Sequence, residues 1–257
     1  FIKDKLQEIV SLTNDNFLFK IFYKIIYFLM LYIVLIFLFI IEKKIVCIYL
    51  RRGLLLKDWF AGKSDIDLMV VLDFLDLNIE DKIFTSIRKN ILFLKKFMPV
   101  IGEIQVCSVG QLSLYHYYGG IKEKEIEFWK VYVKNKEFFK KIKFSKIKDE
   151  YFRIKNFYEI FNAYRLLCSN IIQNKKILVY DIFKFYSDIL KYSIYLHVND
   201  IIYFPSREKI FEYVIAHKYE NLDISILEQL FKFKKNKIFR DKILLNKILL
   251  HTMKYLD

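Results

Sequence analysis

The chain begins with a long apolar stretch. Residues 25–41 are 17 consecutive uncharged and almost wholly apolar positions, with Lys24 before them and Glu42 after them. A helix of this length extends roughly 25 Å, slightly less than the ~30 Å hydrocarbon core of a bilayer. Because the stretch has no polar stripe, it predicts either a transmembrane helix or a helix buried in the protein core. Both alternatives stay open for the N-terminal helical region, residues 1–44.

Three segments after this stretch have the patterns of strands. Residues 45–50 are β-branched and aromatic, residues 65–74 contain a run of large apolar side chains, and residues 100–109 alternate between apolar and polar positions. Between the second and the third, residues 81–97 repeat apolar side chains at helical spacing. The order strand, loop, strand, helix, strand predicts a small mixed β-sheet flanked by helices.

The pattern changes to helices beyond position 150. Apolar side chains recur at helical spacing over 151–174, 176–198 and 206–217, and two further helices are expected before the C-terminus. The sequence therefore predicts an α+β protein whose sheet core is followed by an all-α helical bundle. The expected divisions are a sheet domain over 45–130, a basic linker over 131–150 and the bundle over 151–257.

Composition narrows the class of protein. Only six of the 257 residues are glycine and two are proline, which disfavours collagen-like and many-turned all-β architectures. The chain is 55% apolar, so it can bury a sizeable core, and wholesale disorder is excluded. Cys47, Cys107 and Cys168 are widely spaced and form no C-x-x-C pair, which favours a reducing, cytoplasmic environment.

The net charge of +14 favours an anionic partner: a nucleotide, a nucleic acid or a membrane surface. Only seven of the 43 basic residues are arginine, the side chain that binds phosphate with two hydrogen bonds, so charge alone is a weak guide. The aromatic residues of the bundle fall at helical spacing and are explained more simply as core than as a nucleic-acid surface. A nucleic acid is therefore the least favoured of these three partners, and a membrane anchor through 25–41 stays open.

Two acidic residues stand at the start of the second predicted strand. Side chains alternate along a strand, so Asp65 and Asp67 project from the same face about 7 Å apart. Carboxylates placed this way repel each other unless a cation lies between them, and hard oxygen ligands suit Mg²⁺. Glu103, in the third predicted strand, is a third ligand or a general base if the two strands are neighbours. The alternatives are a turn residue at Asp65, a solvent-facing Asp67 and an ordinary exposed strand residue at Glu103.

This pattern resembles the polymerase-β-type nucleotidyltransferase superfamily over residues 45–110. The family has a Gly-Ser pair after the first strand, about ten residues, then Asp-x-Asp and a later third acid. Here Gly53-Leu54 stands at the Gly-Ser position, ten residues separate it from Asp65, and Glu103 follows on a later strand. A sheet core followed by a helical bundle is similar to the aminoglycoside adenylyltransferases.

The resemblance implies a specific chemistry. Two Mg²⁺ ions would be held by Asp65, Asp67 and Glu103, and Glu103 would accept the proton of the attacking hydroxyl. The substrate would be a nucleoside triphosphate, ATP being the expected one, and AMP would be transferred to a hydroxyl of a small molecule or protein. The residues expected to contact the nucleotide are Gly53, Lys63 and Ser64; Lys63 also fits a solvated loop position.

The chain departs from the family at Leu54, where the family has a serine that holds the triphosphate. Leucine cannot donate that hydrogen bond, so a second hypothesis is a catalytically weakened binding module, either antitoxin-type or a membrane-tethered partner protein. Trp59 and Phe60 fit either stacking on a base or pinning the loop to the core. The four histidines have no metal-type spacing, and no G-x-S-x-G, G-x-G-x-x-G or P-loop motif is present.

Overall fold

The structure is a computed structural model, and it divides into two compact units, Phe1–Lys148 and Asp149–Asp257. The residues that the structure describes are 9–10, 12–13, 16–55, 59–62, 64–74, 81–98, 100–117, 125–144, 149–173, 177–197, 204, 206–217, 224–231 and 239–253.

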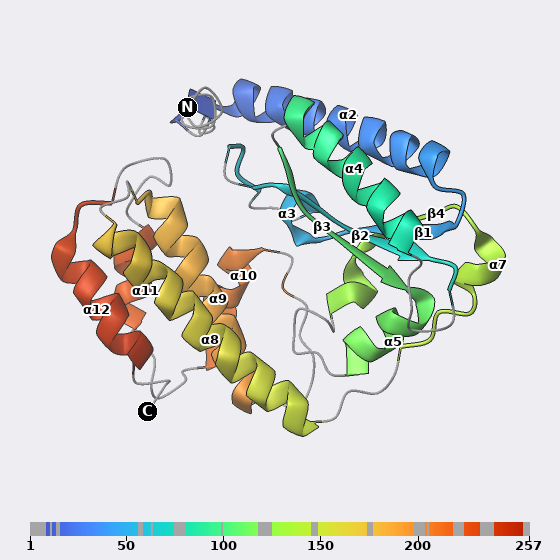
Figure 1. Ribbon diagram of the computed structural model, residues 1–257. Coiled ribbons are helices and arrows are strands. Elements are labelled where there is room, and N and C mark those ends of the chain that lie inside the picture. The colour runs from blue at the N-terminus through green and yellow to red at the C-terminus, as the bar shows by residue number, and fades with distance from the viewer. Residues whose placement is uncertain are drawn as a thin grey trace. The chain divides into compact units, whose positions relative to one another are not determined.

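A four-stranded mixed sheet forms the centre of the first unit (Figure 1). Its strands, in the order β3-β2-β1-β4, are β3 (Ile101–Ser108), β2 (Ile66–Leu72), β1 (Ile45–Leu50) and β4 (Lys130–Val133). β1 pairs antiparallel with β2 and with β4, whereas β2 and β3 are parallel. The three predicted strands and the mixed sheet are confirmed. β4 lies in the segment expected to be a linker and extends the sheet by one edge strand.

The parallel pair is connected by helix α4 (Asp81–Phe97), as the helical spacing of that segment predicted. Alternation along the strands divides the core into two layers. Ile48 and Leu50 of β1 pack in a cluster that includes side chains of α2 (Phe17–Ile41) and α4. Cys47 and Tyr49 point to the other face, where their cluster includes side chains of α5 (Val109–Tyr117). Figure 1 shows α2 and α4 on one side of the sheet and α5 on the other.

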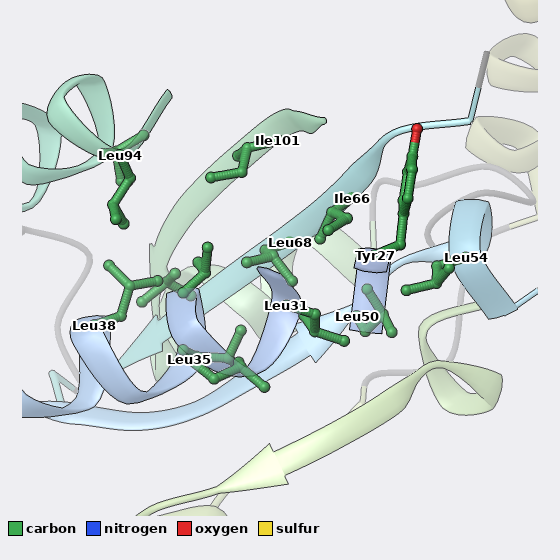
Figure 2. Packing of buried hydrophobic residues seen from close by; sticks show 14 of the residues in the cluster. Tyr27, Leu31, Leu35, Leu38, Leu50, Leu54, Ile66, Leu68, Leu94 and Ile101 are labelled. Atoms are coloured by element: carbon green, nitrogen blue, oxygen red, sulfur yellow. The ribbon is translucent and has the colours of Figure 1, made fainter. Parts of the chain in front are cut away.

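Helix α2 contains the long apolar stretch and is capped at its start by Asn16, whose side-chain oxygen accepts a hydrogen bond from the N–H of Leu18. It is long and apolar enough to cross a membrane, yet 28% of its most apolar window is buried within the protein. The buried side chains all lie on one face and pack on the sheet (Figure 2): Tyr27, Leu31, Val34, Leu35 and Leu38. The helix thus has the packing expected of a core helix, but on one face only.

The described residues of the first unit also form short helices. They are α3 (Arg52–Leu55), the 3₁₀ helix η1 (Glu125–Phe128) and α7 (Lys136–Phe139). Asn135 caps α7 by accepting the N–H groups of Glu137 and Phe138. After α7 the structure describes an irregular segment to Phe144, so part of the expected linker is built into the sheet domain.

The second unit is helical throughout its described residues, apart from short connections, as the sequence predicted. Its helices are α8 (Asp149–Ile172), α9 (Val179–His197), α10 (Arg207–His217), α11 (Ile224–Phe231) and α12 (Lys242–Met253). α9 supplies much of its core: Phe183 meets Phe211 edge to face with ring centroids 4.7 Å apart. The Tyr186 hydroxyl lies 2.8 Å from Nδ1 of the buried His251, which gives that histidine a structural role.

Candidate active site

Asp65 and Asp67 lie together at the start of β2, as their alternation predicted. Both side chains approach Gly102, the second residue of the neighbouring strand β3. A Cβ atom at Gly102 would lie 2.6 Å from Cβ of Asp65 and closer still to Oδ1 of Asp67. Because no side chain fits there, glycine at position 102 makes room for the two carboxylates.

Glu103 is connected to this pair through its main chain. Its N–H donates a hydrogen bond of 2.7 Å to Oδ1 of Asp67. The contact follows from the parallel pairing of β2 and β3, in which a register shift between Ile66 and Leu68 brings Asp67 beside Gly102 and Glu103. A carboxylate that accepts a main-chain N–H is held in one orientation, so Asp67 is fixed toward β3.

The carboxylate of Glu103 is bonded to other groups. Nη1 of Arg51 donates to Oε2 of Glu103 at 2.6 Å, and Nε2 of Gln105 donates to Oε1 at 2.7 Å. The side chain of Arg51 is 14% exposed and that of Glu103 is 57% exposed, so this ion pair lies at the rim of the site.

Arg51 is a candidate site residue that sequence reasoning missed. It follows the last residue of β1, and its N–H donates to the carbonyl of Asp67 at 2.9 Å, which extends the β1–β2 ladder by one bond. Its guanidinium carbon lies 5.2 Å from the ring centroid of Trp129. The available signal was its place between a buried strand and Gly53, since a guanidinium is a side chain suited to binding a phosphate.

The structure places the predicted metal ligands in two groups. Asp65 and Asp67 are adjacent, but the Glu103 carboxylate is engaged by Arg51 and Gln105. Among the residues that the structure describes, no three His, Cys, Asp or Glu side chains are close enough to hold a metal ion together. Two carboxylates are hard oxygen donors of the kind that suits Mg²⁺, and the carboxylate of Glu103 is paired with Arg51.

The loop before Asp65 is a tight turn. The hydroxyl of Ser64 accepts the N–H of Phe60 at 3.1 Å, and the N–H of Ser64 donates to the Phe60 carbonyl at 2.8 Å. Gly62 has a φ of 80°, a left-handed conformation that glycine adopts without strain, and its N–H donates to the Tyr27 hydroxyl at 3.2 Å. Ser64 therefore has a structural bond in the turn. Lys63, also expected to contact the nucleotide, lies outside the described residues.

The two aromatic residues of this loop pack inward. Trp59 and Phe60 are both buried, and the Trp59 ring meets Tyr27 of α2 edge to face with centroids 4.9 Å apart. Of the two interpretations of these residues, the structure favours the one in which they pin the loop to the core.

Gly53 and Leu54 lie in the short helix α3. Leu54 is only 1% exposed and belongs to the same hydrophobic cluster as Leu50 and Tyr27, toward which it points in Figure 2. The side chain at the position of the family's serine therefore contributes to the core of the first unit.

The sheet face beneath the carboxylates is neutral. Burial raises the pKa of the Cys47 thiol to about 12 and that of Cys107 to about 12, and it raises the pKa of the Tyr49 hydroxyl as well. These groups keep their protons near neutral pH, so they are unsuited to act as bases or nucleophiles there.

No protein-family model, curated protein or solved structure matches this chain.

Proposed function

We propose that the first unit is a Mg²⁺-dependent nucleotidyltransferase that moves a nucleoside monophosphate from a nucleoside triphosphate, ATP being the expected one, to a hydroxyl group. The acceptor is a small molecule or a protein. The single observation that carries the proposal is the placement of Asp65 and Asp67 side by side over Gly102, with Asp67 bonded to the main chain of Glu103.

The reaction requires a cation and a base. The acceptor oxygen bonds to the α-phosphorus, the bond between that phosphorus and the bridging oxygen breaks, and pyrophosphate leaves with the bonding electrons. Mg²⁺ held by Asp65 and Asp67 would neutralise the charge of the triphosphate. The acceptor proton goes to a carboxylate, for which the exposed Glu103 is the candidate.

Arg51 gives the proposed site its own positive charge. When a triphosphate binds, its oxygens can replace the carboxylate of Glu103 as the partner of the guanidinium. Glu103 is then released toward the acceptor or the metal. This exchange explains how one residue can be paired with arginine in the protein alone and serve as base or ligand with substrate.

The test is binding of Mg·ATP by isothermal titration calorimetry to the full chain. The variant Asp65→Asn with Asp67→Asn should lose at least tenfold in affinity, because it removes the two negative charges that hold the cation. The matched control is Glu208→Gln with Glu212→Gln on α10, which changes the net charge equally but lies in the other unit. If the aspartate variant binds Mg·ATP as tightly as the wild-type protein, the assignment of the site is wrong.

A second candidate is a catalytically weakened module that binds nucleotide and transfers nothing. The observation that favours it is the burial of Leu54, which leaves no hydroxyl at that position to hold the triphosphate. Incubation with ATP labelled at the α-phosphate distinguishes the two functions. An enzyme releases pyrophosphate and labels an acceptor, whereas a module retains intact ATP.

The exchange Leu54→Ser tests whether the missing hydroxyl limits nucleotide binding. Because Leu54 is buried, serine also creates a cavity, so Leu54→Ala is the matched control with the same cavity and no hydroxyl. A higher affinity for Mg·ATP in the serine variant than in the alanine variant indicates that a nucleotide pocket lies next to α3. Equal affinities indicate that the hydroxyl has no ligand to bind.

A further inference from the structure

The outward face of α2 is apolar along nearly its whole length. Six side chains at helical spacing point away from the sheet and are 54–74% exposed; we call them the outer stripe: Leu18, Phe22, Ile25, Leu29, Ile36 and Ile40. From Leu18 to Ile40 they span 23 residues, or roughly 33 Å of helix. The outward face of an ordinary surface helix is polar. An exposed apolar patch of this extent marks an interaction surface.

Exposed basic side chains lie on the two helices that cover this face of the sheet. α2 and α4 together hold seven lysines and arginines and one acidic residue, Asp81. Lys24 on α2 and Lys89 and Lys96 on α4 are exposed. Both helices cover the same face of the sheet (Figure 1), so these charges lie on the same side of the unit as the outer stripe.

From this face we infer that α2 and α4 bind to the surface of an anionic lipid bilayer, with α2 lying parallel to the membrane and its outer stripe inserted among the acyl chains. Apolar side chains bordered by lysine are the features by which helices bind at a bilayer interface. Charge complementarity identifies the occupant: anionic headgroups neutralise the excess of basic side chains on α2 and α4. Pairing of two copies of the chain through this face would bring like charges together.

The fold determines the orientation of the helix. The opposite face of α2 is buried against the sheet through Leu31, Val34 and Leu38, each at most 1% exposed. Lys134 binds the C-terminal end of the helix by donating to the carbonyls of Phe39 and Glu42. A helix that crossed the bilayer would leave these contacts and uncover the apolar face of β1 and β2. The stripe can enter the membrane while the core of the unit stays intact.

The experiment is flotation of the full chain with vesicles of phosphatidylcholine and with vesicles of equal parts phosphatidylcholine and phosphatidylserine. We expect binding to the second and little to the first. The variant with Ile25→Gln, Leu29→Gln and Ile36→Gln should bind at least tenfold less. Lys89→Gln with Lys96→Gln should weaken binding to the anionic vesicles by about fivefold for each charge removed.

The matched control carries three equivalent exchanges in the second unit, Ile154→Gln, Leu166→Gln and Ile243→Gln, at side chains that are 61%, 53% and 74% exposed. It should bind vesicles as the wild-type protein does. Circular dichroism melting of all variants identifies any that misfold; single exchanges at Ile25 or Leu29 then replace the triple variant.

Three outcomes overturn the inference. One is unchanged vesicle binding by the variant of the outer stripe. Another is a wild-type protein that binds neither vesicle and forms dimers by analytical ultracentrifugation, because a second copy then covers the face. The third is retention in the pellet when cell membranes are extracted with alkaline carbonate, which indicates that α2 spans the bilayer; a helix lying on the surface is released.

Discussion

The substitution Gly102→Ala should displace the two carboxylates of the candidate site that pack against position 102. The added Cβ would lie 2.6 Å from Cβ of Asp65 and closer to Oδ1 of Asp67. Both distances are well below van der Waals contact, so the carboxylates or strand β3 must move. Among the described glycines only Gly62 has a positive φ, so the effect at position 102 is one of space and not of backbone conformation.

The expected change in the free energy of unfolding has three parts. Overpacking a filled position costs about 1–3 kcal/mol. Breaking the hydrogen bond from the Glu103 N–H to the Asp67 carboxylate costs about 1.5–3 kcal/mol, because the acceptor is charged. Alanine also restricts the unfolded chain and returns about 0.4–1 kcal/mol. We expect the free energy of unfolding of the first unit to fall by about 1.5–5.5 kcal/mol, with loss of any Mg·ATP binding.

Tryptophan fluorescence during urea unfolding is the appropriate assay. The chain has two tryptophans, Trp59 and Trp129, and both are buried in the first unit, so the signal reports that unit alone. Gly110→Ala, at the start of α5, is the control, since alanine is the better helix former by up to about 1 kcal/mol. If Gly102→Ala unfolds at the wild-type urea concentration, the aspartates do not pack over position 102 and our account of the site fails.

Three further predictions use the same assay. Arg51→Gln removes the ion pair with Glu103 and the contact with Trp129; because the Glu103 side chain is 57% exposed, the loss of stability should be only about 1 kcal/mol, and an unchanged emission spectrum of Trp129 would contradict the contact. Tyr27→Phe removes the acceptor of the Gly62 N–H and should cost about 0.5–1.5 kcal/mol, whereas Tyr32→Phe, at an exposed tyrosine of the same helix, should cost less. The free energy of unfolding should also fall as the pH rises above about 8.5, because thiols of the unfolded chain then lose protons that Cys47 and Cys107 keep up to a pKa of about 12. For each thiol, this loss of stability approaches about 1.4 kcal/mol for every pH unit. The variant Cys47→Ala should therefore show a shallower fall of stability with pH.

The strands and the acid pair were predictable because their signals are local. β1 is six consecutive buried apolar residues, and alternation alone puts Asp65 and Asp67 on one face. β4 was missed because it is four residues long, begins at an exposed lysine and pairs with a strand more than 80 positions earlier. Short edge strands with lysine carry little pattern of their own.

The partners of Glu103 were beyond prediction for a different reason. Arg51 and Glu103 are 52 positions apart and meet only because β2 lies between their strands. The burial of Leu54 depends likewise on α2, whose side chains share its cluster. The spacing in the sequence aligns Leu54 with the serine of the resembled family. The direction of the Leu54 side chain, however, is determined by tertiary packing.

Helix α2 shows why its sequence allowed two interpretations. A helix that is apolar on one side can be explained by packing on a sheet. A helix that is apolar on every side requires a second apolar environment for its outer face. The sheet accounts for Leu31, Val34 and Leu38, and it cannot account for Ile25, Leu29 and Ile36, which point the opposite way. Asp67 and Arg51 belong to the face of the sheet that carries Met69 and Tyr49, away from α2. A bilayer bound to the outer stripe would therefore leave the candidate site open to water, where a nucleotide can reach it.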